Sequence, residues 1–316
     1  MDHGEHGTMT DLPPFTLNRA LEFSPDAFFL VGCLLALALY GWGVVRLRAR
    51  GDSWSPGRTI SFVLGVLTVA LMMCTALNDY GMVMFSVHMV QHMVISMVSP
   101  ILLLLGAPVT LALRALPVAG RGRKGPRELL LALLHSGFMR FVTHPAFTIP
   151  LFIASLYGLY FTPLFDFLME SKPGHIAMMV HFLSTGLIFF WPIIGVDPGP
   201  HRPGYLMRML ELFAGMPFHA FFGIALMMAS EPMVRAYDNP PASLGIDPLS
   251  DQNAAGGIAW AFSEIPSVLV LVALVYQWYR SDQRQAKRSD RAADRDGDKE
   301  LVAYNAYLAS LRARGQ

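Results

Sequence analysis

The sequence has 316 residues, of which 53% are hydrophobic and 15% are charged. Its mean hydropathy of +0.43 excludes an ordinary soluble domain and is typical of a chain that crosses a membrane several times. The two cysteines are too few for a disulfide framework. We therefore expect an all-α, polytopic protein that sits in a lipid bilayer and binds no nucleic acid.

Residues 1–26 are polar and acidic, and they contain His3 and His6. The segment lacks the basic n-region of a signal peptide, so we expect no cleavage there. His3 and His6 would hold a metal ion only loosely. A flexible, solvated tail is the favoured interpretation.

Seven apolar segments are long enough to cross a bilayer. They run at about 27–46, 58–78, 83–105, 144–165, 174–195, 205–229 and 253–279. Seven spans place the two termini on opposite sides of the membrane. The expected parts are an external tail (1–26), a transmembrane domain (27–279) and a charged cytoplasmic tail (280–316).

Lysine and arginine alternate between the connecting loops and predict the orientation. If the N-terminus lies outside, the inner loops and tail carry 21 of the 24 basic residues, and Arg19, Lys172 and Arg235 lie outside. Cytoplasmic loops of membrane proteins carry this excess of positive charge. We expect the N-terminus outside and the C-terminus inside.

Three segments outside the spans have recognisable patterns. Residues 126–135 predict a helix at the inner membrane surface, because they are apolar but short and flanked by charge. The loop 230–252 is expected to cap the external mouth, and residues 300–311 predict a short amphipathic helix.

Asp79 and Asp251 lie at the outer ends of their helices, where a carboxylate is normally solvated.

Two histidines lie four residues apart inside the third apolar segment. On a helix, His88 and His92 occupy one face, one turn apart, and Ser96 and Ser99 continue the stripe. Ionisable groups inside a membrane are costly and usually face a functional interior. This stripe is therefore the first candidate for a site.

Three further helices bring ionisable groups to a similar depth. His88 and His92 lie roughly 8 and 14 Å below the outer end of their helix, and His181, His219 and Glu264 roughly 10, 15 and 16 Å below theirs. Each residue alone is as readily explained by a hydrogen bond between helices. Five at a similar depth favour one shared site, in which Glu264 is a ligand or orients a ligating imidazole.

The ligand types favour copper. Imidazole and thioether groups suit this metal better than zinc or haem iron, and the many methionines favour the reduced ion, Cu(I). There is no cysteine cluster for iron–sulfur and no all-oxygen cage for calcium or magnesium. We expect His88 and His92 as the main ligands, with His181 and His219 completing the site. The auxiliary ligands would be Met84, Met89, Met93, Met178 and Met216.

Three blocks of sequence resemble one protein family. The first two are His-Met-Val-Gln-His-Met at 88–93 and Met-Pro-Phe-His-Ala-Phe-Phe-Gly at 216–223. The third comprises Asp-Gln at 251–252, Ala-Gly-Gly-Ile-Ala-Trp at 255–260 and Glu-Ile-Pro at 264–266. Together they resemble the CtaG family, seven-helix assembly factors of caa3-type cytochrome c oxidase. The stretch 304–309 is similar to actinobacterial-type members.

The resemblance implies a role in building the copper-containing core of the oxidase in the bacterial plasma membrane. A member would supply copper to the buried CuB centre, with oxidase subunit I as a partner and an external copper chaperone as the donor. It would be a carrier and not an enzyme.

Two alternatives to a copper carrier stay open at this point. A b-type haem protein would use paired axial histidines to move electrons, and a Soret band would identify it. A copper permease needs a continuous polar path, for which the inner half of the membrane offers little besides Glu211.

Overall fold

The computed structural model of the protein describes residues 12–120, 123–200, 203–296 and 299–314. His3 and His6 lie outside these residues. The described chain is helical, and its extended pairing amounts to one isolated bridge between Phe23 and Thr75. The chain divides into two compact units, Met1–Val270 and Leu271–Gln316. The prediction of an all-α protein is confirmed.

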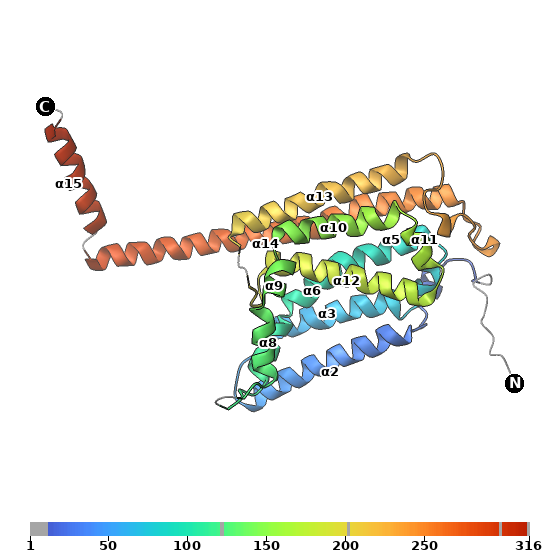
Figure 1. Ribbon diagram of the computed structural model, residues 1–316, viewed down its shortest axis with the longest axis horizontal. Coiled ribbons are helices and arrows are strands. Elements are labelled where there is room, and N and C mark those ends of the chain that lie inside the picture. The colour runs from blue at the N-terminus through green and yellow to red at the C-terminus, as the bar shows by residue number, and fades with distance from the viewer. Residues whose placement is uncertain (1–11, 121–122, 201–202, 297–298, 315–316) are drawn as a thin grey trace. The chain divides into compact units, whose positions relative to one another are not determined.

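Apolar helices lying side by side make up the first unit (Figure 1). Six helical segments in the described part of the chain are long and apolar enough to cross a membrane. They are Ala27–Ala49 (α2), Pro56–Met73 (α3), Phe85–Ala115 (α5 to α7), Lys172–Ile194 (α12), Tyr205–Met228 (α13) and Pro248–Arg291 within α14 (Pro248–Asp296). The prediction of a polytopic membrane protein is confirmed.

The fourth predicted span is shorter than expected. Helix α10 covers Pro145–Tyr160, whereas the apolar pattern extended over 144–165. The helix ends early because Pro163 disfavours helical backbone at the residue before it, and a separate short helix, α11 (Leu164–Met169), follows. At 1.5 Å per residue α10 is about 24 Å long, a little less than the ~30 Å hydrocarbon core of a bilayer.

The third span contains the histidine stripe and changes its winding directly after it. Helix α5 (Phe85–Met93) is followed by a π-helical turn (Val94–Val98), then by α6 (Ser99–Leu105) and α7 (Pro108–Ala115). Pro100 has no N–H to donate into the regular hydrogen-bond ladder, which favours the irregular turn. Such π-turns frequently occur at functional sites.

This irregular span lies at the centre of the bundle. Helix α6 packs against α3 and α12, and the π-turn packs against the same two helices. The approach of α12 is close because Gly186 faces the backbone carbonyl of Ser96 and the ring of Pro100. A side chain at Gly186 would displace the turn that follows His92.

A carboxylate from a distant helix fixes the start of α5. Asp251, in α14, accepts hydrogen bonds from the backbone N–H groups of Phe85 (2.6 Å) and Ser86 (3.3 Å). The expectation that Asp251 is solvated is wrong, because its side chain is buried and satisfies the free N–H groups at this helix start. Asp79 is half-buried and accepts a hydrogen bond from Ser24.

The loop before α14 folds back over the same end of the bundle. It contains two short turns, Arg235–Tyr237 and Ala242–Leu244. The ring of Tyr237 stacks on Phe85 at 5.0 Å, and its hydroxyl donates to the carbonyl of Gly81 at 2.9 Å. Burial raises the pKa of Tyr237 well above its usual value, so the hydroxyl stays protonated as a donor.

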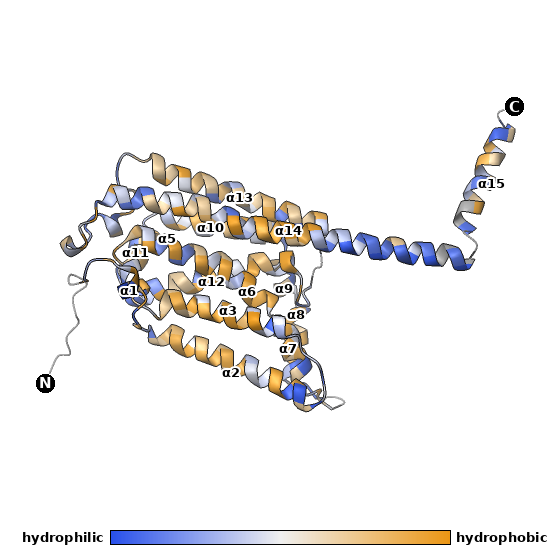
Figure 2. Cartoon of the chain, turned by 180° about the vertical axis from the view of Figure 1, so that it is seen from behind, coloured by the Kyte–Doolittle hydropathy of each residue, from blue (hydrophilic) through white to orange (hydrophobic). Residues whose placement is uncertain are grey.

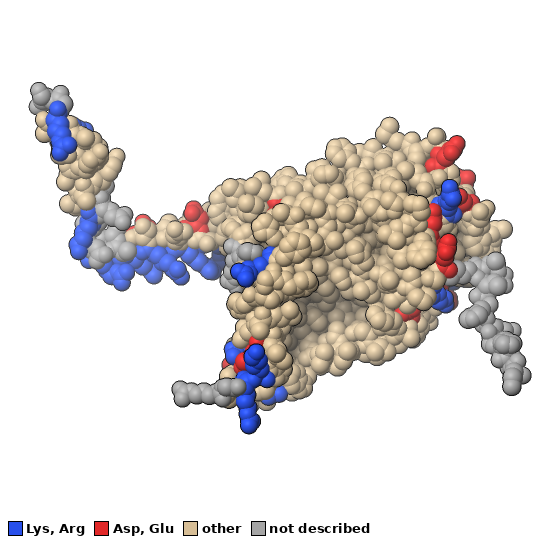
Figure 3. All heavy atoms as spheres, viewed as in Figure 1, with Lys and Arg blue, Asp and Glu red and all other residues tan. Residues whose placement is uncertain are grey.

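The opposite end of the bundle has a short helix where the sequence predicts one. Helix α8 covers Pro126–Leu134 and runs across the ends of the long helices, as expected for a surface helix (Figure 1). The remaining short helices of this unit are Leu17–Ala20 (α1), Leu77–Gly81 (α4) and Gly137–Val142 (α9). Acidic side chains and a few basic ones lie at the end where α2 begins, and mainly basic ones where it ends (Figure 3).

The second unit contains the last part of α14 and a separate helix, α15 (Lys299–Arg314). Helix α15 confirms the helix predicted at 300–311. Figure 2 shows that most of this unit is hydrophilic, in contrast to the apolar helices of the first unit.

Candidate metal centre

The first histidine pair joins α5 to α12. His88 is fully buried, and its ring centroid lies 5.8 Å from that of His175, which is 2% exposed. The Nε2 atom of His88 lies 3.1 Å from the hydroxyl of Tyr160. If Nε2–H donates to that hydroxyl, the lone pair of Nδ1 is left to bind a metal ion.

One turn further along α5, the second pair joins it to α13. The ring centroids of His92 and His219 are 6.3 Å apart, and both rings are buried. A cavity of about 10 Å³ lies beside them, which is enough room for about one water molecule. Its polar lining consists of the two histidines with Ser96, Ser155 and Thr185.

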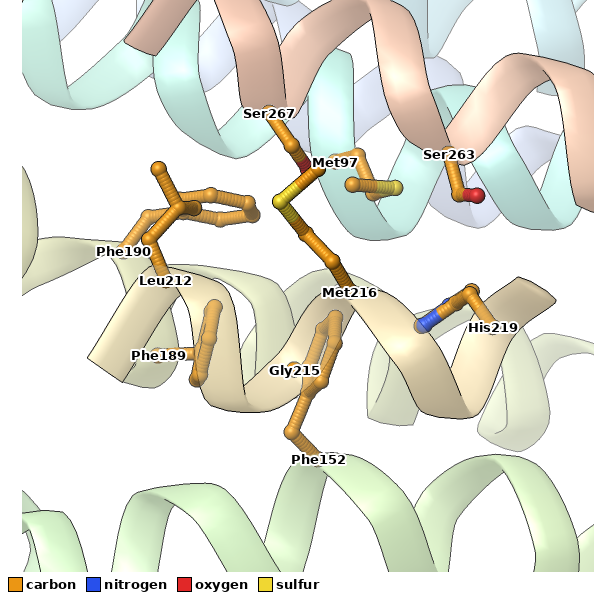
Figure 4. Close-up of a pocket in the computed structure, with 10 residues that line it drawn as sticks. All are labelled: Met97, Phe152, Phe189, Phe190, Leu212, Gly215, Met216, His219, Ser263 and Ser267. Atoms are coloured by element: carbon orange, nitrogen blue, oxygen red, sulfur yellow. The ribbon is translucent and has the colours of Figure 1, made fainter. Parts of the chain in front are cut away.

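A second small cavity is also bordered by His219 (Figure 4). It also measures about 10 Å³ and is lined by Met97 and Met216 together with Ser263 and Ser267 of α14. The thioether of Met216 reaches toward Met97 and Ser267 (Figure 4). His219 therefore has an imidazole neighbour in His92 and shares the second cavity with two methionines.

Several ring nitrogens of these four histidines have no hydrogen-bond partner. A buried polar atom without a partner is costly and indicates a missing ligand or water. The unpartnered atoms are His88 Nδ1, His92 Nδ1, His92 Nε2, His175 Nε2 and His219 Nε2. Their grouping around the histidine stripe of α5, with His175 on α12 and His219 on α13, makes this region the best candidate for a bound ion.

The geometry fits pairs of ligands and not a preformed larger cluster. Within the residues that the structure describes, no three side chains of histidine, cysteine, aspartate or glutamate are grouped to hold a metal ion. Two imidazoles that share one ion through bonds of about 2 Å have ring centroids roughly 5 to 6.5 Å apart. Both histidine pairs have this spacing, so a bound ion would draw further ligands from methionine.

His181 lies beside the second pair and has a partner. Its Nε2 atom is 2.9 Å from the hydroxyl of Ser155, which in turn lies 3.4 Å from that of Thr185. Both hydroxyls line the cavity next to His92. His181 thus extends the polar lining of that cavity and leaves Nδ1 as its second nitrogen.

Glu264 is half-buried on α14 and lines neither small cavity. Ser263 and Ser267 of the same helix line the second cavity instead (Figure 4). Among the described residues, no hydrogen bond joins Glu264 to His92 or His219.

The predicted methionines are distributed around the stripe. All but one are buried, and Met216 is half-buried in the thioether cavity. The buried ones are Met84, Met89, Met93 and Met178.

Sequence reasoning missed three residues of this region: His175, Tyr160 and Met97. A signal existed for His175, because it lies three and four residues before Met178 and Met179 and so shares their helical face. Met97 lies four residues after Met93 on the histidine helix. Tyr160 is the last residue of α10, and no pattern in the sequence marked it as part of the site.

Comparison with known proteins assigns the family. Residues 38–281 match the model of the cytochrome c oxidase caa3 assembly factors, Caa3_CtaG. The chain belongs to this family. As a member of this family with six apolar helices of spanning length in its described part, it is a multi-pass protein of the bacterial plasma membrane.

Curated relatives of this caa3 assembly factor occur in mycobacteria. Uncharacterized protein Mb0105 of Mycobacterium bovis and MT0111 of Mycobacterium tuberculosis are each 49% identical over 285 residues, which is 89% of this chain and 43% of theirs. Protein ML1998 of Mycobacterium leprae is 49% identical over 277 residues, 86% of this chain and 42% of its own. The chain spans less than half the length of these relatives. No solved structure matches it.

Proposed function

We propose that this caa3 assembly factor is a copper carrier that binds Cu(I) between its histidine pairs and delivers it to the CuB site of oxidase subunit I. It accepts and releases an ion without catalysing a reaction. The observation that carries the proposal is the set of unpartnered, buried imidazole nitrogens on His88 and His92 of α5 and on the histidines paired with them, His175 and His219.

The donor set supports Cu(I) over other ions. Neutral imidazoles and thioethers bind this soft, singly charged ion, which also costs less to bury than a divalent one. His92 and His219 would supply the nitrogens, and Met97 and Met216, which line the second cavity beside His219, would supply sulfur. His88 and His175 form a second position of the same kind.

The size of the cavities argues against the haem alternative. Each of the two cavities beside His219 has about 10 Å³ of free volume, which suits one ion or water molecule and not a macrocycle. One observation favours the permease alternative. Glu211 is buried in the inner half of α13, and both of its carboxylate oxygens lack a hydrogen-bond partner. A single carboxylate does not make a path.

The proposal is tested in cells that lack the gene and carry variants of it. His92→Gln together with His219→Gln should lower the yield of active caa3 oxidase under copper limitation, and added copper should restore part of it. Copper per purified subunit I should fall in parallel, because the defect is in metal loading.

His144→Gln is a suitable control, because it removes a histidine from the start of α10, away from the paired residues. Wild-type oxidase yield in the double variant under copper limitation would contradict the proposal. A full loss of oxidase protein that copper does not relieve would also contradict it, since that result indicates a structural role.

A further inference from the structure

A larger pocket opens at the end of the bundle that is predicted to face outside. It has a volume of about 250 Å³ and is lined by the starts of α2 and α12 and by residues of α4. We name it the outer vestibule, and its lining residues are Ser24, Pro25, Asp26, Ala27, Asn78, Asp79, Met82, Lys172, His175 and Ile176.

The outer vestibule carries groups that attract a cation. Asp26 uses one carboxylate oxygen to cap α2, and Asp79 uses one to accept from Ser24 Oγ at 2.8 Å. The second oxygen of each has no hydrogen bond from the described residues. Met82 adds a thioether, and Lys172 is the one basic side chain in the lining.

His175 connects the outer vestibule to the interior. It lines the vestibule, yet it is 2% exposed and its Nε2 atom has no partner. Its ring centroid lies 5.8 Å from that of His88, so one ion at His175 is within reach of the next imidazole. His92 follows His88 by one helical turn, and His219 lies beside His92.

We infer that the outer vestibule is the entry site for copper and that His175 passes the ion from it to His88. The inference rests on the proposed copper-carrier function. The route then descends one turn of α5 from the first histidine pair to the second. Each transfer exchanges one imidazole for another around the ion and needs no redox step.

A second pocket at the same end serves as a comparison. It has a volume of about 340 Å³ and is bounded by Tyr160, with Asp166 and Arg235 as its charged side chains. It contains no histidine, and its charges are one of each sign. The outer vestibule is therefore the better entrance for a cation, although both pockets reach residues that adjoin His88.

The test measures how fast purified protein takes up Cu(I) from a coloured Cu(I)–chelator complex in a stopped-flow instrument. The variant Asp26→Asn with Asp79→Asn removes both charges, and asparagine still caps a helix well. Uptake should slow by about tenfold or more, because a charged cleft raises the local cation concentration. The final copper stoichiometry should stay at the wild-type value.

Two further variants make the test specific. Lys172→Gln should speed uptake, since it removes the positive charge of the vestibule. Asp166→Asn changes charge in the comparison pocket and should leave the rate unchanged. Far-UV circular dichroism and gel filtration check the fold of each variant.

The outcomes separate this inference from the proposed function. Wild-type uptake rates in the double aspartate variant, an unchanged or slower rate in Lys172→Gln, or equal slowing by Asp166→Asn would each overturn the entry site while leaving copper binding intact. Wild-type protein that takes up no Cu(I) at all would overturn the copper-carrier proposal itself.

Discussion

The imidazole ring centroids of His92 and His219 lie 6.3 Å apart in the middle of the bundle, although the two residues belong to different helices, α5 and α13. His92 has both ring nitrogens unpartnered and His219 has one. A single ion between them would satisfy one nitrogen of each. The first prediction follows from this shared role.

Copper binding should depend on His92 and His219 together. Either single change to glutamine is expected to weaken Cu(I) binding strongly, and the double variant should be little weaker than each single one. Residues that share one partner show such non-additive effects. Competition with a Cu(I) chelator measures the three affinities, and strictly additive losses would argue for two separate sites.

His175 should matter more than His181. Both lie on α12, but His175 is buried with a free Nε2, whereas Nε2 of His181 is already hydrogen-bonded to Ser155. His175→Gln is expected to weaken the affinity for copper by about tenfold or more, as loss of a ligand or of the group that orients it commonly does. His181→Gln is the matched control, and a larger effect there would restore it as a main ligand.

Glu264→Gln should change copper affinity by less than about threefold, because loss of a group that orients a metal ligand costs about 10–100-fold in affinity. Glu264 lines neither small cavity and has no hydrogen bond to His92 or His219 among the described residues. The same chelator competition measures it. A loss of tenfold or more would place the carboxylate at the metal after all.

The cap at the start of α5 should link stability to copper binding. Asp251→Ala removes two hydrogen bonds to the backbone and is expected to lower the stability by about 1–2 kcal/mol. Copper affinity should fall too, because His88 lies in the first turns of that helix. Asp247→Ala is the control: Asp247 caps α14 through Ser250 N–H at 2.8 Å, so its loss should cost stability alone.

Gly186 should not tolerate a side chain. A methyl group there would overlap the carbonyl of Ser96 and the ring of Pro100, so Gly186→Ala is expected to cost about 1–3 kcal/mol. Gly32→Ala is the matched control, since open space surrounds that position on α2. Thermal unfolding in detergent compares them, and equal melting temperatures would show that α12 shifts freely away from the turn.

The sequence was sufficient to predict the spans, because the bilayer forces long apolar helices with charged ends. It was also sufficient to predict the histidine stripe, since residues four apart on a helix must share a face. The α10 boundary was wrong by several residues because Pro163 overrides the apolar pattern.

The partners of that stripe could not be predicted as fully. Depth along a helix is readable from the sequence, but rotation about the helix axis depends on packing between helices. Rotation is what turns Ser263 toward His219 while Glu264 stays outside both cavities, and what brings His175 to His88. Asp251 was misjudged for a similar reason, because its target helix is distant in the chain.

The most direct test of a buried Cu(I) site is X-ray absorption at the copper edge on purified protein loaded with one equivalent of Cu(I). The account predicts a reduced ion with imidazole nitrogens and sulfur in its shell. In His92→Gln with His219→Gln it predicts less bound copper and a changed spectrum, because only the pair of His88 and His175 remains. An identical spectrum and identical copper content in wild type and the double variant would contradict it.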